Sequence, residues 1–371
     1  MFECLALFLI IYLFNYSMID ICMQKGGNMD KKLFLMGIFS LLVSITPLTS
    51  CSSDKTSVIN DKAYTYVDDT KTSLYFGKYP QSKVNDNTLI ESLNNNAGTL
   101  PTSEDTYNWT DYGYYEKGSI KSYMYYIDID QDNDGYNDYR GVYFSQYRPS
   151  NTETSSLSSY IYQSYNGYDT NTVYWFKYEP IKWDILKLED NKALIISDLI
   201  LDSQDYFYNT DNRSNIEDYQ GNSSTSTIYP NNYMYSHIRS WLNTTFYQSA
   251  FTTLEQQIIE ISSIDNSGSS TAGSRNKYLC DNTSDKMFIL SYKEVNTYYS
   301  SNDERISKGS DYAKCQGLYV SNTNSYYYLR SPNCRDSEYV RIINIDGKSI
   351  NSYNKINDTS IGVRAACWIN L

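Results

Sequence analysis

Residues 172–199 read TVYWFKYEPIKWDILKLEDNKALIISDL, and this stretch decides the class of fold. Three runs rich in β-branched and aromatic residues follow one another: Thr172–Tyr178, Ile181–Leu188 and Lys192–Leu199. Turn residues separate them, Glu179-Pro180 after the first run and Glu189-Asp190-Asn191 after the second. Short runs of this composition between turn residues are typical of β-strands. The stretch therefore predicts three consecutive strands.

Weaker strand patterns lie on both sides of this stretch, and helical patterns are few. The strand patterns are Ser73–Pro80, Tyr123–Ile129, Tyr139–Phe144, Met287–Leu290, Tyr326–Leu329, Tyr339–Ile345 and Ile361–Leu371. Helices are predicted near residues 236–246, after a capping box at Thr252 and after a second capping box at Ser291. We therefore expect an α+β fold of many short antiparallel strands with a few helices.

The N-terminal region predicts export and a lipid anchor. Lys31 and Lys32 precede an apolar run, Leu33–Val43, and Leu48-Thr49-Ser50-Cys51 follows it. The apolar run is too short for a spanning helix, which needs about 20 apolar residues. Leu-Thr-Ser-Cys resembles the lipobox of bacterial lipoproteins, which implies a diacylglycerol on Cys51 and removal of residues 29–50 as a signal peptide. The alternative is a plain secretory signal with an incidental cysteine.

Two segments flank this signal. Residues 1–28 are interpreted as a mis-annotated upstream extension, because Lys25-Gly26-Gly27 before Met29 is what an in-frame ribosome-binding site would encode. The alternative is a genuine first membrane segment, Leu5–Phe14. Residues 51–72 are polar and predict a flexible linker behind the lipid. The folded part is therefore expected on the outer side of the cell membrane, at the extracellular surface or in a periplasm.

Composition and charge exclude two classes of function. The chain of 371 residues has 31 Lys and Arg against 43 Asp and Glu, which is a net charge of −12. Nucleic-acid binding needs clustered basic residues, so no nucleic-acid partner is expected. The single histidine, His237, excludes metal sites that need two or more imidazoles. Its place in an amphipathic pattern favours a structural or surface role over catalysis. The 41 tyrosines fit either A/T-rich codon usage or a sugar-binding or adhesive surface.

Four cysteines follow the predicted anchor: Cys280, Cys315, Cys334 and Cys367. An even number of cysteines in an exported chain predicts two disulfides. We favour the pairs Cys280–Cys315 and Cys334–Cys367 among the three arrangements. Free thiols, as in an anaerobic organism, are the alternative.

Residues 130–138, DQDNDGYND, have the spacing of a calcium-binding loop. Carboxylates stand at positions 1, 3, 5 and 9 of that loop: Asp130, Asp132, Asp134 and Asp138. Gly135 takes position 6, but position 12 is Gly141, so the usual bidentate glutamate is missing. The same residues between two strands also predict an acidic hairpin turn. Calcium is thus a candidate cofactor, and the acidic hairpin is the alternative.

Further blocks of sequence occur in order along the chain. They are Tyr75–Ser82, Tyr139–Phe144, Tyr147–Pro149, Asn166–Tyr168, Val173–Trp183, Leu201–Gln204, Ile238–Asn243, Asp285–Ser291, Leu329–Pro332 and Ile361–Ala366. Together they resemble the bacterial domain of unknown function DUF6273, over roughly residues 73–371. The resemblance names a family but implies no activity.

The C-terminal half is also similar, more weakly, to the C-type-lectin-like fold of formylglycine-generating enzymes. This likeness implies a β-rich N-terminal part over residues 73–170 and a lectin-like core over residues 171–371. It implies structural roles for Arg330 and Arg364, whose guanidinium groups would be bound by carbonyls or acids under the loops. Trp183 and Trp241 are expected to be structural residues as well.

The sequence contains no Gly-x-Ser-x-Gly elbow, no His-Glu-x-x-His and no phosphate-binding loop. We therefore expect a surface-displayed binding module rather than an enzyme. Its ligand would be a glycan or another surface protein, contacted by the polar and aromatic loops over residues 203–233 and 296–325. An envelope-modifying or hydrolytic enzyme and a purely structural lipoprotein are the alternatives. A concave pocket with convergent acids would favour the enzyme.

Overall fold

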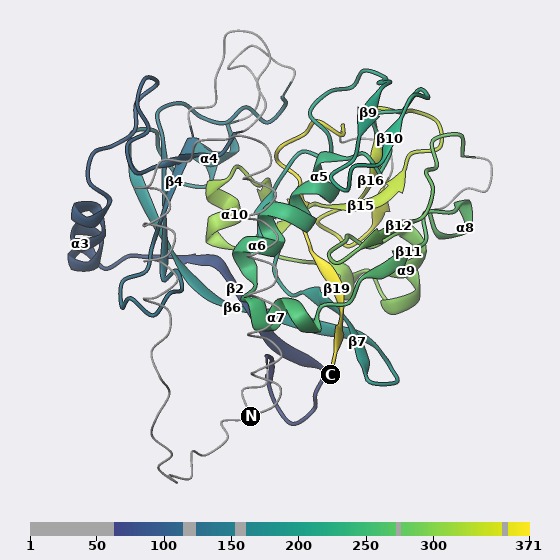
Figure 1. Cartoon of the computed structure of the whole chain (residues 1–371), viewed down its shortest axis with the longest axis horizontal. Coiled ribbons are helices and arrows are strands. Elements are labelled where there is room, and N and C mark those ends of the chain that lie inside the picture. The colour runs from purple at the N-terminus through teal and green to yellow at the C-terminus, as the bar shows by residue number, and fades with distance from the viewer. Residues whose placement is uncertain (1–62, 114–123, 153–160, 272–275, 351–354) are drawn as a thin grey trace, which may run out of the picture. The chain divides into compact units, whose positions relative to one another are not determined.

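The computed structural model describes residues 63–113, 124–152, 161–271, 276–350 and 355–371. The predicted signal peptide and Cys51 lie outside these residues. The described residues belong to one compact unit, Asp61–Leu371 (Figure 1). Within the described ranges, no helix has the length and apolar character needed to cross a membrane.

The larger sheet has the strand order β1-β2-β6-β5-β4-β3, with β7 paired to β6 and β19 paired to β7. Its strands are β1 (Thr65–Tyr66), β2 (Ser73–Lys83), β3 (Thr110–Asp111), β4 (Met124–Ile129), β5 (Tyr139–Phe144), β6 (Val173–Glu189), β7 (Lys192–Ser197) and β19 (Ala366–Asn370). All of these pairings are antiparallel. The α+β class expected from the sequence is confirmed.

Two details of this sheet correct the sequence predictions. Part of the predicted linker 51–72 is ordered, because β1 pairs with β2 through Tyr66 and Leu74. The predicted turn at Glu179-Pro180 is absent, and β6 runs straight through Pro180. Proline is tolerated there because the partners on that side of β6 change: β5 pairs with residues up to Lys177, and β7 pairs from Trp183 onward.

A second sheet has the order β17-β16-β15-β18-β8, in which β15 and β18 are parallel. Its strands are β8 (Asp202–Ser203), β15 (Tyr327–Pro332), β16 (Val340–Ile343), β17 (Ser349–Ile350) and β18 (Gly362–Val363). Three two-stranded antiparallel sheets contain the remaining strands of the described residues: β9 (Ile216–Glu217) with β10 (Ser223–Ser224), β11 (Ser262–Ile264) with β12 (Thr283–Asp285), and β13 (Val320–Ser321) with β14 (Asn324–Ser325).

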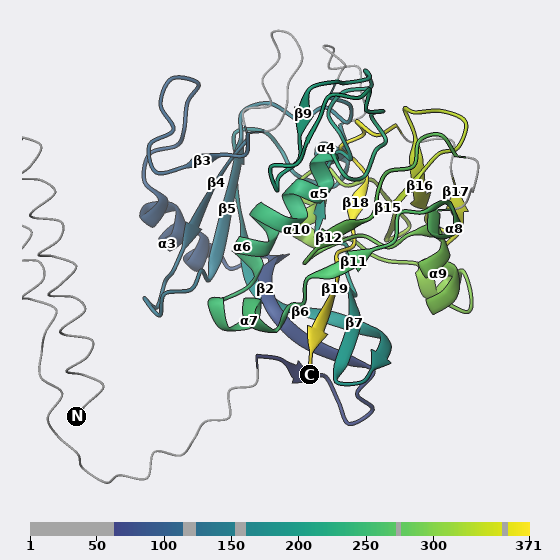
Figure 2. The same cartoon turned by 45° about the vertical axis from the view of Figure 1, so that its right-hand side comes forward.

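The helices are short. They are α3 (Asn87–Ala97), α4 (Tyr162–Tyr165), α5 (His237–Trp241), α6 (Tyr247–Ala250), α7 (Thr253–Ile258), α8 (Gly268–Thr271), α9 (Tyr292–Tyr298) and α10 (Asp311–Cys315), with a π-helical turn at Leu242–Phe246 and a 3₁₀ turn at Asp303–Arg305. Both predicted capping boxes form, Thr252 with Glu255 and Ser291 with Glu294. Helices α6 and α10 pack on β2 (Figures 1 and 2).

One hydrophobic core joins the two sheets to the helices. Trp183 is fully buried in it, and its indole N–H donates to the Phe76 carbonyl at 2.7 Å. Trp241, which is 8% exposed, packs on Phe246 with the ring centroids 5.3 Å apart. A smaller core around Trp175 is covered by α3. Residues 73–170 and 171–371 therefore share buried surface.

Arg330 and Arg364 are both buried and contact main-chain carbonyls and acids. Arg330 donates to the Ile289 carbonyl at 2.8 Å and to Glu294 Oε1 at 2.7 Å. Arg364 donates from Nε to the Ser197 carbonyl at 2.6 Å. These contacts hold helix α9 and strand β7 against the second sheet.

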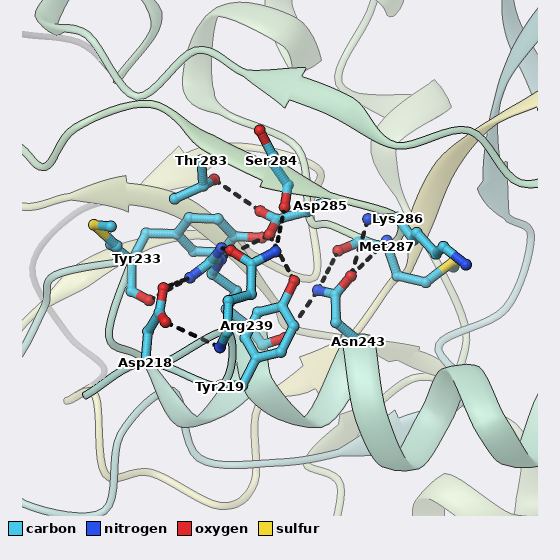
Figure 3. Close-up of polar contacts among 12 residues, drawn as sticks. Asp218, Tyr219, Tyr233, Arg239, Asn243, Thr283, Ser284, Asp285, Lys286 and Met287 are labelled. Atoms are coloured by element: carbon cyan, nitrogen blue, oxygen red, sulfur yellow. Dashed lines mark hydrogen bonds and ion pairs between the residues drawn. The ribbon is translucent and has the colours of Figure 1, made fainter. Parts of the chain in front are cut away.

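Arg239, in helix α5, is the centre of a buried ion-pair network (Figure 3). Its Nε donates to Asp285 Oδ1 at 2.8 Å, and its Nη1 donates to Asp218 Oδ2 at 3.0 Å and to the Met234 carbonyl at 2.7 Å. Its Nη2 donates to Gln220 Oε1 at 2.9 Å. All three charged side chains are at most 1% exposed.

Asn243 extends this network along the same helical segment (Figure 3). Its Oδ1 accepts the backbone N–H groups of Lys286 and Met287, each at 3.0 Å. Its Nδ2 donates to the Met287 carbonyl at 2.8 Å. The two sequence blocks Ile238–Asn243 and Asp285–Ser291 are therefore bound to each other by side chains of the first block.

Candidate functional site

A cavity of about 530 Å³ lies between the larger sheet and the helical segments α5, α6 and α10. Its volume is within the range of about 300–1,000 Å³ that is usual for small-ligand sites. We call it the Arg140–Asp202 cavity, after two of its lining residues. Strands β2, β3, β4, β5 and β8 contribute to it from the sheets, and α5, α6 and α10 contribute from the helices.

One wall holds a fixed ion pair. Arg140 binds Asp128 through two hydrogen bonds, Nε to Oδ1 at 2.8 Å and Nη2 to Oδ2 at 2.7 Å. The two residues are direct cross-strand partners in the β4–β5 hairpin, so the strand register creates the pair. Burial alone would lower the pKa of Arg140, but Asp128 outweighs it and keeps that pKa well above its usual value. The guanidinium also lies over the Tyr126 ring, 4.3 Å from the centroid.

Asp202 lies at the floor of the cavity and is only 2% exposed. Burial raises the pKa of this carboxyl to about 6, because the charged form loses its hydration. Hydrogen bonds limit the rise: Asp202 accepts the Tyr79 hydroxyl at 2.7 Å and the Ser203 N–H at 2.7 Å. Gln204 Nε2 donates to it at 3.3 Å. The group can therefore change its charge near pH 6.

His237 is a second titratable group on the cavity wall. Its Nδ1 lies 3.1 Å from Asp205 Oδ2, with the imidazole side chain 38% exposed and the carboxylate 3% exposed. Burial lowers the pKa of His237, but Asp205 outweighs this effect and raises it above its usual value. The same pairing lowers the pKa of Asp205 despite its burial. The structure thus places the single histidine beside the cavity rather than on an isolated surface.

Aromatic rings form much of the remaining surface of the cavity. The rings belong to Tyr79, Tyr112, Tyr126, Trp241 and Tyr312. The Tyr112 and Tyr312 hydroxyls are hydrogen-bonded to each other at 2.9 Å, and Tyr79 packs edge-on against Tyr312. Tyr112 and Tyr126 are half-buried and offer rigid ring faces to a ligand at little cost in conformational entropy, whereas Tyr79, Trp241 and Tyr312 are at most 8% exposed.

The acidic loop lies at the β4–β5 turn. Asp130, Asp132 and Asp138 bring carboxylate oxygens within 4.8 Å of one another, but Asp134 is not part of this group. Asp134 Oδ1 instead accepts the Tyr136 N–H at 2.8 Å. The other carboxylates also accept loop N–H groups, for example Gly135 N–H to Asp130 Oδ2 at 2.8 Å. Calcium binding stays a prediction, with three candidate ligands in place of four.

The structure forms neither predicted disulfide: Cys280, Cys315, Cys334 and Cys367 are all free thiols. The two members of each expected pair lie in different surroundings. Cys367 is fully buried on β19, whereas Cys334 is exposed. Cys280 lies near Tyr233 and Met234, whereas Cys315 lies near Lys83. The sequence spacing of about 35 residues could not reveal this separation.

A labelling experiment distinguishes these thiols. We expect iodoacetamide to modify Cys334 in the native protein and the other three cysteines only after unfolding. Thiolates are the reactive form, and burial raises the pKa of Cys280 to about 11 and that of Cys315 and Cys367 above the usual value. Peptide mass spectrometry with and without urea measures the pattern. Labelling that requires both urea and a reductant would instead show disulfides.

The sequence does not predict most of the residues that line the cavity. The loops over 203–233 and 296–325 supply only Gln204 and Tyr312, while the ion pair and Asp202 come from strands. Arg140 and Asp202 do lie in sequence blocks that supported the family resemblance. No spacing rule brings those two blocks together, because the contact depends on how the sheets pack.

Residues 190–371 match the family model described as domain of unknown function (DUF6273). The chain belongs to the DUF6273 family. The DUF6273 match begins in the turn between β6 and β7 and includes Asp202, His237 and the Arg239 network. Asp128 and Arg140 precede it, so the cavity is built by the DUF6273 segment and the strands before it. No curated protein and no solved structure matches the chain.

Proposed function

We propose that this DUF6273 protein is a lipid-anchored surface module that binds a glycan in the Arg140–Asp202 cavity. The observation that carries the proposal is the combination of rigid rings with fixed polar groups in one concave site. A sugar has apolar C–H faces and a rim of hydroxyls. Aromatic faces suit the first, and oriented donors and acceptors suit the second.

The charges of the cavity disfavour an anionic ligand and are compatible with a neutral, hydroxyl-rich one. Arg140 and Asp128 neutralise each other and present polar atoms at fixed positions, while Asp111 and Asp202 leave the remaining lining acidic at neutral pH. Gln204 lines the cavity, and its buried Oε1 has no hydrogen-bond partner among the described residues. Thr245, Gln248 and Ser249 add uncharged polar groups from the helical side. A concave site of this kind suits a chain-like ligand better than the flat face of a folded protein.

The predicted anchor supports the location. A diacylglycerol on Cys51 would hold the folded unit at the outer side of the cell membrane, because each buried CH₂ contributes about 0.8 kcal/mol. We also propose a C-type-lectin-like arrangement for residues 171–371. The parallel neighbours β15 and β18 and the buried Arg330 and Arg364 support it.

A glycan array tests the binding function. We expect the purified full-length protein in detergent to bind a subset of linear glycans. Thr245→Phe should weaken that binding at least about 10-fold, equivalent to about 1.4 kcal/mol. Thr245 lines the cavity and is exposed, so a larger side chain fills the site without disturbing the core. Thr88→Phe on α3 is the matched control, because Thr88 is exposed away from the cavity. If the protein binds no glycan on the array, the proposal is wrong.

The cavity is concave and is lined by three acids, Asp111, Asp128 and Asp202, and this arrangement favours a second candidate, a glycan hydrolase. A carboxyl with a pKa near 6 can donate a proton to a leaving group close to neutral pH. If glycans that bind are also cleaved, released reducing ends will accumulate, and Asp202→Asn will abolish the cleavage while leaving binding measurable. That outcome would replace the binding module by an enzyme. Binding without release of reducing ends supports the module.

A further inference from the structure

A second cavity of about 290 Å³ adjoins the Arg140–Asp202 cavity. We call it the Tyr136 cavity. The two cavities share Gln248 and Ser249 of helix α6 in their walls. Gln248 is exposed and Ser249 is half-buried, so the shared wall is formed by side chains at the surface rather than by packed core.

A second contact links the cavities on the side of the sheet. The Tyr178 hydroxyl donates to Asp128 Oδ1 at 3.0 Å. Tyr178 lines the Tyr136 cavity, whereas Asp128 lines the Arg140–Asp202 cavity. The boundary between the two spaces therefore includes the Tyr178–Asp128 contact and the side chains of Gln248 and Ser249.

The Tyr136 cavity resembles its neighbour in chemistry. It has the half-exposed ring of Tyr136, the buried ring of Tyr178, the neutral polar groups of Asn137 and Thr252, and the exposed cationic side chain of Lys78. The carboxylate of Glu255 is already used, because it accepts the Gly77 N–H at 3.0 Å and the Thr252 N–H at 2.8 Å. Rings and neutral polar groups thus continue from one cavity into the next.

The acidic hairpin presents Tyr136 to this cavity. Tyr136 is 50% exposed, and the Asp134 carboxylate holds its backbone N–H. Asp130 holds the neighbouring Gly135 N–H. The carboxylates of the hairpin therefore position an exposed ring in the wall of the Tyr136 cavity, outside the lining of the Arg140–Asp202 cavity.

We infer that the two cavities form one extended cleft, which holds a linear oligosaccharide with at least one sugar unit in each cavity. This inference rests on the proposed function, and it adds that the ligand is a polymer rather than a single sugar. A chain that occupies both cavities contacts the rings of both, so affinity should rise with chain length until the cleft is filled.

Isothermal titration with chain-length series tests the cleft. The probes are chito-, cello-, xylo- and α-1,4-gluco-oligosaccharides of one to six units, added to the full-length protein in detergent. For the series that binds, we expect at least about 10-fold tighter binding by the longer members than by the shortest member that binds, or about 1.4 kcal/mol.

Two exposed tyrosines provide a variant and its matched control. Tyr136→Ala should remove most of the gain in affinity with chain length, measured as the ratio of the affinity of the longer members to that of the shortest member that binds. Tyr107→Ala should change neither, because Tyr107 is 52% exposed and lines neither cavity. Circular dichroism and thermal unfolding of each variant report whether it folds normally.

The outcomes separate the two proposals. Binding whose affinity does not depend on chain length, or whose length dependence survives Tyr136→Ala, overturns the extended cleft and leaves the glycan-binding function standing. No binding by any of the four series, together with a silent array, overturns both.

Discussion

Replacing Arg239 with methionine is expected to lower the free energy of unfolding by about 3–5 kcal/mol. The variant leaves Asp218 and Asp285 buried without their cation, and it removes a donor from Gln220 and from the Met234 carbonyl. A buried charge that loses its partner keeps its full desolvation cost. Because folded domains are stable by only about 5–15 kcal/mol, this loss is a large fraction of the total.

Urea unfolding followed by circular dichroism measures this effect. Lys187→Met is the matched control, because Lys187 forms a solvent-exposed pair with Glu189 and should change the free energy of unfolding far less than Arg239→Met does. The triple variant Arg239→Met, Asp218→Asn, Asp285→Asn should recover part of the loss, since it removes the unpaired charges. A change of under about 1 kcal/mol in Arg239→Met would show that the network does not stabilise the fold.

Asp202→Asn is expected to abolish a pH dependence of stability between about pH 4 and pH 6. The pKa of Asp202 is raised from 3.8 to about 6 in the folded protein, so in this window the folded state binds a proton that the unfolded state has lost. The contribution of Asp202 therefore destabilises the fold increasingly as pH rises through the window. Above about pH 6 the destabilisation by Asp202 is constant, at about 3 kcal/mol.

The measurement compares the unfolding free energy of wild type and Asp202→Asn at several pH values. The free energy of unfolding of Asp202→Asn should rise relative to that of the wild type from pH 4 to pH 6, and the difference between the two should be constant above pH 6. His237 and Asp205 titrate in both proteins, so their contributions cancel in the difference. The lowered pKa of Asp205 contributes stability above the unfolded pKa of that carboxyl, and this contribution is lost as pH falls through the folded value. The raised pKa of His237 contributes stability below the unfolded pKa of the imidazole, and this contribution is lost as pH rises through the folded value. A difference that does not vary with pH would show that Asp202 has an ordinary pKa.

The elements that the sequence predicts well are those with a local cause. Strand β5 begins and ends at the predicted residues, Tyr139 and Phe144, because β-branched and aromatic composition is a property of the run itself. The capping boxes at Thr252 and Ser291 form because a side chain and an N–H three residues away need nothing else. The turn predicted at Pro180 is wrong, because whether a strand accepts proline depends on which strands pair with it at that residue.

The cavity has no such local cause. Tyr79 and Asp202 are separated by 123 positions along the chain, and their hydrogen bond exists only because the two sheets pack together. The pKa of Asp202 likewise follows from burial, which no neighbour in sequence sets. The cysteines illustrate the same limit, since their even number predicted pairs that the packing keeps apart.

By itself, the sequence determined the α+β class, the longer strands, the two capped helix starts at Thr252 and Ser291, and the family. These depend on composition and on contacts within a few residues. Only the tertiary structure decided that Asp128 and Arg140 of one hairpin face Asp202 and His237 across a cavity. The physical reason is that burial and long-range contact, which set ionisation and ligand geometry, arise when distant segments pack, and residue spacing does not record them.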